Sequence, residues 1–60
     1  MEAEEIALQI FDEHFESSNI TYEDARDSTF VTIDNIIKVL EQYGIDVTLW
    51  YDVKRATHRL

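Results

Sequence analysis

Apolar residues recur every three or four positions over residues 2–16, and acidic residues fall on the opposite side of the same helical wheel. This spacing predicts an amphipathic helix, because positions three and four apart share one face of an α-helix. The acidic residues at its start suit the positive end of the helix dipole. The apolar side comprises Ala3, Ile6, Ala7, Ile10, Phe11 and Phe15, and the opposite side comprises Glu2, Glu5, Asp12, Glu13 and Glu16.

Polar residues 17–19 interrupt this pattern, and their side chains compete for the backbone hydrogen bonds that a helix needs. Thr21 is predicted to cap a short second helix over residues 21–28. Residues 27–29 are expected to end it, since the following Phe30-Val31 pair is apolar and combines an aromatic residue with a β-branched one, both of which are poor helix formers. A turn or a short extended piece is therefore predicted at this pair.

A third helix is predicted over residues 33–43, with Thr32 at its N-cap. Its apolar stripe consists of Ile33, Ile36, Ile37, Leu40 and Tyr43. Gly44, the only glycine, is expected to adopt the left-handed conformation that ends a helix, with Ile45 as the apolar residue of a Schellman motif.

The tail supports two interpretations. Apolar and polar residues alternate over residues 45–54, and the types present favour a strand, which we place at 46–53. The alternative is a helix with Asp46 at its N-cap and an apolar stripe of Leu49, Val53, Ala56 and Leu60. The predicted fold is therefore mostly α within an α+β class, with three helices followed by one C-terminal strand. The alternative is a small all-α bundle.

The 60 residues are expected to form one small acidic domain spanning 1–60. Chains of this size usually need disulfides, a metal or a partner subunit, and this sequence has no cysteine. A homodimer is therefore expected, with the 45–53 segment at or near its interface. No apolar run approaches the roughly 20 residues of a membrane span. The first residues are acidic and lack the basic segment with which a signal peptide begins, so no signal peptide is expected. A soluble protein with no membrane partner, located in the cytoplasm, is expected.

Charge is distributed unevenly along the chain. Residues 1–37 hold ten acidic residues and one basic residue, Arg26, for a net charge of −9. Residues 38–60 hold three acidic and four basic residues, for a net charge of +1. Direct binding to nucleic acid is disfavoured, because phosphates select a basic surface. A basic protein partner is favoured instead.

Catalytic chemistry has little support in the sequence. There is no cysteine and no glycine before position 44, so a thiol nucleophile and a phosphate-cradling loop are both excluded. His14 is predicted to lie at the edge of the core and His58 at a solvated or interface position, so neither is expected to bind a metal. No enzymatic activity and no cofactor are expected.

The acidic side of the first predicted helix is the leading candidate for a functional surface, because no basic residues are interspersed to neutralise it. The expected partner-binding residues are Glu5, Asp12, Glu13, Glu16, Glu23, Asp24, Asp27 and Asp34. A second group consists of aromatic residues expected at an interface, where tyrosine and tryptophan are enriched. These are Tyr22, Trp50 and Tyr51.

Residues 19–28, Asn-Ile-Thr-Tyr-Glu-Asp-Ala-Arg-Asp-Ser, follow an acidic helix and resemble a stretch of the Ocr family of phage antirestriction proteins. Residues 44–47, Gly-Ile-Asp-Val, resemble a second stretch of that family. Ocr-type proteins are acidic homodimers that imitate the phosphate charge of bent DNA and occupy the DNA groove of type I restriction–modification enzymes. The resemblance implies such a role for the matching carboxylates of Glu23, Asp24 and Asp27.

Residues 32–47 are also similar to the last helix and following strand of repressor-type helix-turn-helix proteins, including antitoxins. The sequence therefore favours two alternative functions. The first is a non-enzymatic, phage-type inhibitor that mimics DNA phosphate charge and blocks a nucleic-acid-binding defence protein, such as a restriction enzyme, a nuclease or a CRISPR effector. The second is an antitoxin-like or regulatory interaction module that dimerises through its C-terminal segment.

Overall fold

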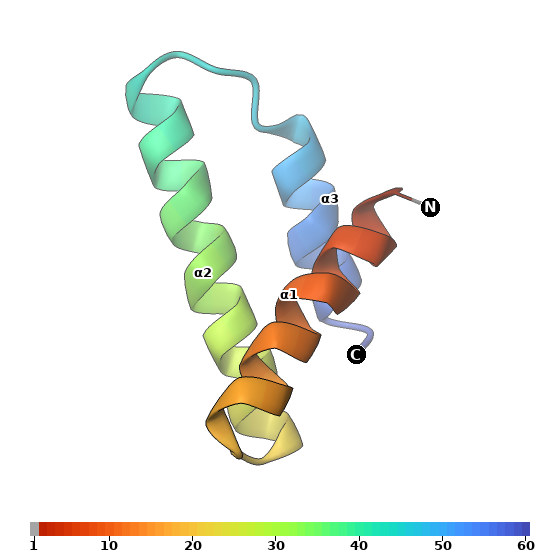
Figure 1. Cartoon of the computed structure of the whole chain (residues 1–60). Helices are drawn as coiled ribbons and strands as arrows, with labels where there is room; N and C mark the ends of the chain where they lie inside the picture. The colour runs from red at the N-terminus through yellow and green to blue at the C-terminus, as the bar shows by residue number, and fades with distance from the viewer. Residues whose placement is uncertain (1) are drawn as a thin grey trace.

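The chain folds into three α-helices, and each helix packs against the other two (Figure 1). A computed structural model describes residues 2–60. The helices are α1 (Glu2–Ser18), α2 (Tyr22–Gln42) and α3 (Thr48–Thr57). The start of α1 lies beside α3. The loop of residues 43–47 joins α2 to α3 at the end of the molecule opposite the turn between α1 and α2. The mostly α prediction is confirmed.

The predicted first helix and the boundary after it are confirmed, with two more residues at the end of the helix. Ser17 donates a hydrogen bond from its hydroxyl to the Glu13 carbonyl, and Asn19 turns the chain with φ of 50°. Asn is among the few residues that tolerate this left-handed conformation. The Thr21 hydroxyl then accepts a hydrogen bond from the backbone N–H of Asp24 at 3.2 Å, so Thr21 caps α2 as predicted.

The prediction of two helices at 21–28 and 33–43, with a turn between them, is wrong. Residues 22–42 form one continuous helix whose buried positions are Ala25, Thr29, Ile33 and Ile37. These four positions are one turn apart, so a single helix carries all of them into the core. Burial along this stripe outweighs the low helix propensity of the β-branched residues at 29–32.

Thr32 does not cap a helix, which corrects the prediction. The hydroxyls of Thr29 and Thr32 donate to the carbonyls of Ala25 at 2.7 Å and Ser28 at 3.0 Å, each four residues earlier. A threonine in mid-helix satisfies its hydroxyl in this way. Both side chains therefore fit inside α2.

The predicted ending at Gly44 is confirmed. Gly44 has φ of 69°, and its N–H donates to the Glu41 carbonyl at 3.1 Å. The N–H of Ile45 donates to the Leu40 carbonyl at 3.0 Å. These two bonds together form a Schellman motif, which ends α2 and turns the chain towards α3.

The predicted strand at 46–53 is wrong, and the all-α alternative fits the structure. Residues 48–57 form α3, which buries Val53, Ala56 and Thr57. A single strand would have no partner for its backbone groups within the described chain, whereas a helix satisfies them internally. The Asp46 carboxylate accepts from the backbone N–H of Thr48 at 2.9 Å and from its hydroxyl at 2.7 Å, at the start of α3.

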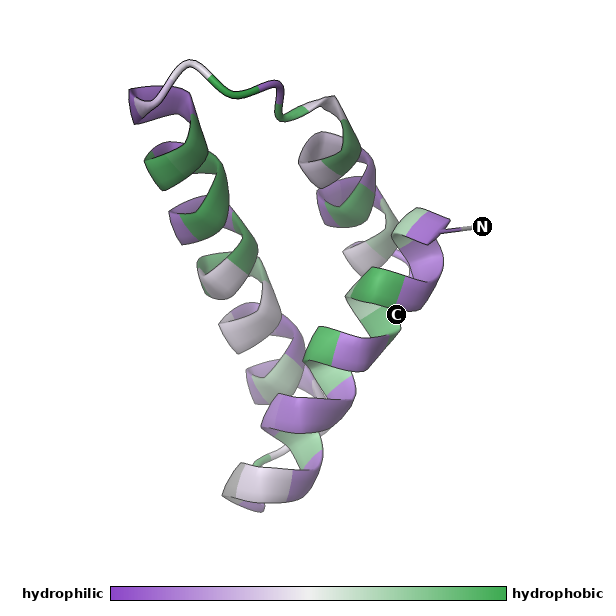
Figure 2. Ribbon diagram, turned by 45° about the horizontal axis from the view of Figure 1, so that its top comes forward, coloured by the Kyte–Doolittle hydropathy of each residue, from purple (hydrophilic) through white to green (hydrophobic). Residues whose placement is uncertain are grey.

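The core is small, and half of its apolar members are alanines. It consists of Ala3, Ala7, Phe11, Ala25, Ile33, Ile37, Val53 and Ala56. Alanines let the helices approach closely, but each buries little apolar surface. Apolar colouring also continues along α2 towards its C-terminal end, beyond the part covered by α1 (Figure 2).

Candidate functional site

Four of the predicted carboxylates form one exposed surface on α1. Glu5, Asp12, Glu13 and Glu16 are all exposed, and they lie opposite the side of the helix that is buried in the core. They are called the α1 acidic face. With a helical rise of 1.5 Å per residue, this face extends about 16 Å along the helix axis. A shallow hollow lined by these four side chains, Leu8 and Gln9 follows it.

The α1 acidic face lacks neutralising partners within the described part of the chain. Helix α1 contains six acidic residues and no basic residue. Among them, only Glu4 takes part in an ion pair in residues 2–60, with Arg59 at 3.7 Å. The carboxylates of the face are therefore available to a cationic partner.

The carboxylates of Glu23, Asp24 and Asp27 lie on a different surface. They are exposed on α2, on the side turned away from its buried stripe. Because α1 and α2 face each other through their buried stripes, their acidic sides point outward in different directions. The two surfaces come closest around the 19–21 turn, so the carboxylates do not form one flat face.

Asp34 has a structural partner. Its carboxylate lies 2.9 Å from the Lys54 ammonium and joins α2 to α3. The pKa of Lys54 is raised, mainly because its ammonium group donates a hydrogen bond to the Asp34 carboxylate and secondly because that carboxylate is negatively charged. Asp34 is thus compensated within the chain, unlike the carboxylates of the α1 acidic face.

The predicted interface aromatics are separated in the structure. Trp50 is half-buried against the core, whereas Tyr51 is exposed on the outer side of α3. Tyr22 lies at the start of α2 and packs on two rings of α1, with ring centroids 4.7 Å from Phe11 and 6.3 Å from Phe15. Phe11, Phe15 and Tyr22 are called the aromatic cluster.

The aromatic cluster was not recognisable as a unit from the sequence. Phe11 and Phe15 were assigned to the apolar stripe of one helix and Tyr22 to an interface. Their contact depends on the turn that folds α2 back onto α1. The only local signal is the one-turn spacing of the two phenylalanines, whose rings stack with centroids 5.6 Å apart.

Three exposed apolar residues gather at the end of α2, and only Ile45 lies in the 45–53 segment that the sequence placed at or near an interface. Tyr43, expected in the helix stripe, is 77% exposed, and Val39 and Ile45 are about half exposed. Val39 and Tyr43 are one turn apart on the same side of α2, and Ile45 is drawn back to the helix end by its bond to Leu40. These three residues are called the loop-end apolar patch.

The two histidines occupy the kinds of position expected. His14 is half-buried, and its Nε2 lies 2.9 Å from the Thr32 hydroxyl oxygen. Because the Thr32 hydroxyl proton goes to the Ser28 carbonyl, Nε2 is the donor in this bond. His58 is exposed, and its ring lies 4.5 Å from the ring of Phe30.

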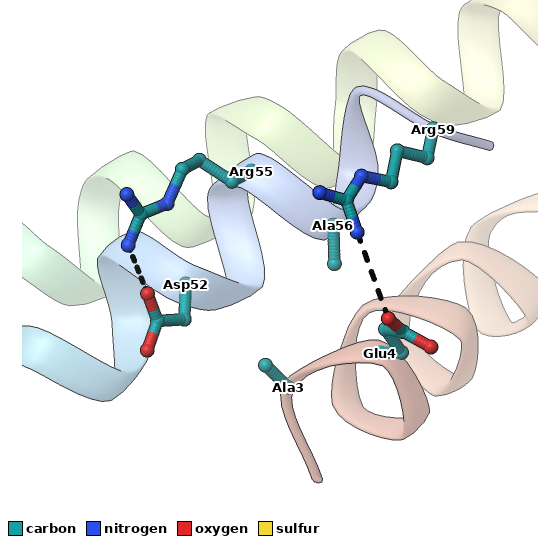
Figure 3. Close-up of a pocket in the computed structure, with 6 residues that line it drawn as sticks. All are labelled: Ala3, Glu4, Asp52, Arg55, Ala56 and Arg59. Carbon is teal, nitrogen blue, oxygen red and sulfur yellow. Dashed lines mark hydrogen bonds and ion pairs between the residues drawn. The ribbon is translucent and has the colours of Figure 1, made fainter. Parts of the chain in front are cut away.

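A pocket between the start of α1 and α3 contains compensated charges (Figure 3). Arg59 reaches across to Glu4, and Arg55 is paired with Asp52 on its own helix. Two alanines, Ala3 and Ala56, form the remaining wall. Since each arginine already has a carboxylate partner, the pocket has no surplus charge for a ligand.

Within residues 2–60, no group of three or more metal-ligating side chains lies close enough together to hold an ion. None of the three helices, over the same residues, combines the length and the apolar character needed to cross a membrane. Comparisons with protein-family models, curated protein sequences and solved structures found no match to the chain.

Proposed function

We propose that the protein is a non-enzymatic acidic inhibitor that presents carboxylates in place of DNA phosphates and blocks a nucleic-acid-binding defence protein. Restriction enzymes, nucleases and CRISPR effectors are the target classes. The observation that carries the proposal is the α1 acidic face, which is exposed and has no basic residue on its helix. The resemblance of residues 19–28 to Ocr-type proteins supports the same function.

The spacing of the carboxylates suits this role. Asp12 and Glu16 are one helical turn apart, which places them about 6 Å apart along the axis. DNA presents a somewhat denser row of single charges, one about every 3.4 Å of axis on each strand, against one about every 4–5 Å for the four carboxylates of the α1 acidic face. A protein site built from lysine and arginine to hold phosphates can therefore pair with the carboxylates instead. The interaction should weaken with added salt, because exposed charges are screened within about 10 Å at 0.1 M ionic strength.

Displacement of DNA from candidate targets tests the proposal. A labelled duplex is bound to a restriction enzyme, a nuclease or a CRISPR effector, and its release on addition of the chain is followed by fluorescence anisotropy. The chain is expected to displace DNA from at least one target class, more weakly as salt rises. Failure to displace DNA from all three classes would contradict the proposal.

Two double variants separate position from net charge. Asp12→Asn with Glu16→Gln changes the α1 acidic face, whereas Glu41→Gln with Asp52→Asn removes the same charge elsewhere. The first is expected to weaken displacement by several-fold and the second by less than two-fold. Equal losses would mean that only the net charge matters. If Tyr51→Ala abolishes binding while the first double variant does not, the recognition surface lies on α3.

The loop-end apolar patch favours a second candidate function, a regulatory interaction module that forms a homodimer. Tyr43 alone leaves roughly 150 Å² of side chain in water, given the size of aromatic side chains. The patch also lies in the part of the chain with a net charge near zero, so two copies approach there with little repulsion. The segment at this interface is then 39–45, at the end of α2.

Light scattering at micromolar concentration tests the dimer. The unmodified chain is expected to show twice its 7.1 kDa mass, and Tyr43→Ser to return it to a monomer without unfolding it. Leu8→Ser is the control, since Leu8 is 48% exposed on α1 and lies outside the loop-end apolar patch. A folded monomer for the unmodified chain would exclude this second candidate and leave the inhibitor proposal unaffected.

A further inference from the structure

The aromatic cluster leaves two rings open to solvent on top of a buried one. Phe11 is buried, whereas Phe15 is 40% and Tyr22 is 47% exposed. The rings of Phe11 and Phe15 are stacked, with planes 14° apart, and Tyr22 is tilted against both. These contacts hold the two exposed rings in place without covering them. The cluster is therefore a preformed aromatic surface at the α1–α2 end.

Carboxylates lie next to these rings along the chain. Asp12 follows Phe11, Glu16 follows Phe15 and Glu23 follows Tyr22. All three are exposed. Asp12 also precedes Phe15 by three positions, which places it on the same side of α1. Residues 11–24 contain five acidic residues and no basic residue, so the rings lie in a strongly negative environment.

Within residues 2–60, no ion pair joins a basic side chain to Asp12, Glu16 or Glu23. Arg26, the only basic residue before Lys38, follows Tyr22 by one turn and is half-buried. The ring pairs of the cluster are formed among its own three members. The face of an aromatic ring attracts a cation, and neighbouring carboxylates add to that attraction. The site is thus complementary to a cation that comes from another molecule.

We propose that the aromatic cluster, with the carboxylates of Asp12 and Glu16, binds an arginine side chain of the basic partner. The guanidinium plane stacks on the exposed ring of Phe15 or Tyr22, and its N–H groups donate to a carboxylate. Arginine fits better than lysine, because its guanidinium is planar, weakly hydrated and able to form bonds in its plane while it stacks. This inference rests on the proposed function and specifies it: the chain would mimic the stacking surface of a base as well as the charge of a phosphate.

A second copy of the chain is a poorer occupant for the same surface. Two copies that met at their α1–α2 ends would bring the five acidic residues of each segment together, with no basic residue between them. Such like-charge contacts are repulsive across an interface. A basic partner removes this repulsion and also covers the rings.

Two capped peptides, octa-arginine and octa-lysine, provide the probes. Their binding to the full chain is measured by isothermal titration at about 50 mM salt, where exposed charges are incompletely screened. The unmodified chain is expected to bind octa-arginine two- to five-fold more tightly. This range corresponds to the about 0.5–1 kcal/mol of one exposed cation–π contact.

Matched variants assign that preference to the rings. Phe15→Leu with Tyr22→Leu keeps apolar side chains against Phe11 and is expected to make the two peptides bind equally. Tyr51→Leu is the control, because Tyr51 is 46% exposed, almost the same as Tyr22. It is expected to keep the preference for octa-arginine. Loss of the preference in the Tyr51 control, or its persistence in the ring variant, would overturn the inference.

Ring proton shifts in the unmodified chain provide a readout that does not depend on variants, should the ring variant fail to fold. Titration with octa-arginine is expected to shift the resonances of Phe15 and Tyr22 and to leave those of Tyr51 unchanged. Unshifted rings at saturation would refute the inference. Weaker self-association in the ring variant, with unchanged peptide binding, would instead identify a second copy as the occupant.

The same titrations distinguish this inference from the proposed function. Asp12→Asn with Glu16→Gln is expected to weaken both peptides and to reduce the dependence of binding on salt. If that happens while the rings prove irrelevant, the charge mimic stands and the arginine site is wrong. If the carboxylate variant binds both peptides as tightly as the unmodified chain, the proposed function fails with it.

Discussion

Proline at position 31 tests the continuity of α2. Val31 lies in mid-helix, where the sequence predicted a turn, and its side chain is 60% exposed. Val31→Pro removes the backbone N–H that bonds to the carbonyl four residues earlier, and the proline ring clashes with that carbonyl. Since the valine side chain contributes little burial, the change acts mainly on the backbone.

The expected loss is large compared with the stability of the chain. Proline in a helix interior costs about 3 kcal/mol or more. A domain of 60 residues is expected to have a free energy of unfolding of roughly 3–9 kcal/mol. Val31→Pro should therefore remove a third of the stability at least. At about 4–8 °C per kcal/mol for a domain of this size, the melting temperature should fall by at least about 12 °C.

Circular dichroism during urea and thermal unfolding measures this loss, with Val31→Ala as the control. Alanine removes the same exposed side chain but favours the helix, so the control should be as stable as the unmodified chain or more stable by up to about 0.7 kcal/mol. If Val31→Pro unfolds within about 1 kcal/mol of Val31→Ala, then residue 31 is not in a helix interior and the description of α2 is incorrect.

Four further predictions concern Gly44 in the loop, Asp46 and Lys54 at the two ends of α3, and Tyr43 in the loop-end apolar patch. Gly44→Ala is expected to lower the free energy of unfolding in urea by about 1–2 kcal/mol, because alanine is strained at the φ of 69° found there. No atom lies within 4 Å of the new Cβ, so the loss would come from the backbone and not from a clash. Gly44→Asn should lose less, and equal losses would argue against backbone strain. Hydrogen bonds from the Thr48 hydroxyl and N–H lower the pKa of Asp46, so the stability that the Asp46 carboxylate contributes is present above the ordinary aspartate pKa and is lost as the pH falls through the lowered value. Acid unfolding of Asp46→Ala should show less of this loss, and an acid profile equal to that of the unmodified chain would argue against the two hydrogen bonds. The pKa of Lys54 is raised, so the stability that its ion pair with Asp34 contributes is fully present below the ordinary lysine pKa and is lost as the pH rises through the raised value. Lys54→Met should make stability depend less on pH in the alkaline range, and a slope equal to that of the unmodified chain would count against the ion pair. Tyr43→Ser should change the melting temperature of the monomer by only a few degrees, because the side chain is mostly exposed; a loss of more than 10 °C in a monomer would mean that Tyr43 is packed.

The two ends of α2 could be predicted from the sequence because their signals are local. Thr21 caps α2 through a bond to a residue three positions on, and Gly44 ends it through bonds within six residues. Such signals need no knowledge of the rest of the fold. The periodicity of α1 was equally clear, because its apolar and acidic sides are cleanly separated.

The two errors arise where distant contacts override local preference. Residues 29–32 are poor helix formers, but a helix there carries Thr29 and Ile33 into the core. The alternation at 46–53 fits a strand, but α1 and α2 offer a surface that a helix with Val53 and Ala56 can cover. Neither surface exists until the helices have met.

In the candidate site, too, local features could be predicted from the sequence and long-range contacts could not. Exposure of the α1 acidic face follows from the helical wheel alone. Two features needed the assembled fold: the ion pair of Asp34 with Lys54, and the meeting of Tyr22 with Phe11 across the turn. Residues far apart in the sequence make both contacts, and no spacing rule predicts them.

The absence of basic residues from α1 makes that helix electrostatically frustrated. Asp12 and Glu16 repel each other one turn apart. Glu13 and Glu16 also lie near the negative end of the helix dipole, where a cation would be favourable. A cationic partner at this end relieves both conflicts at once, so the bound chain should resist unfolding better than the free one by more than the direct contacts alone provide. Selection for thermal stability in isolation would replace these same residues with lysine or glutamine, and the variants recovered in that way would lose the proposed binding to a basic partner.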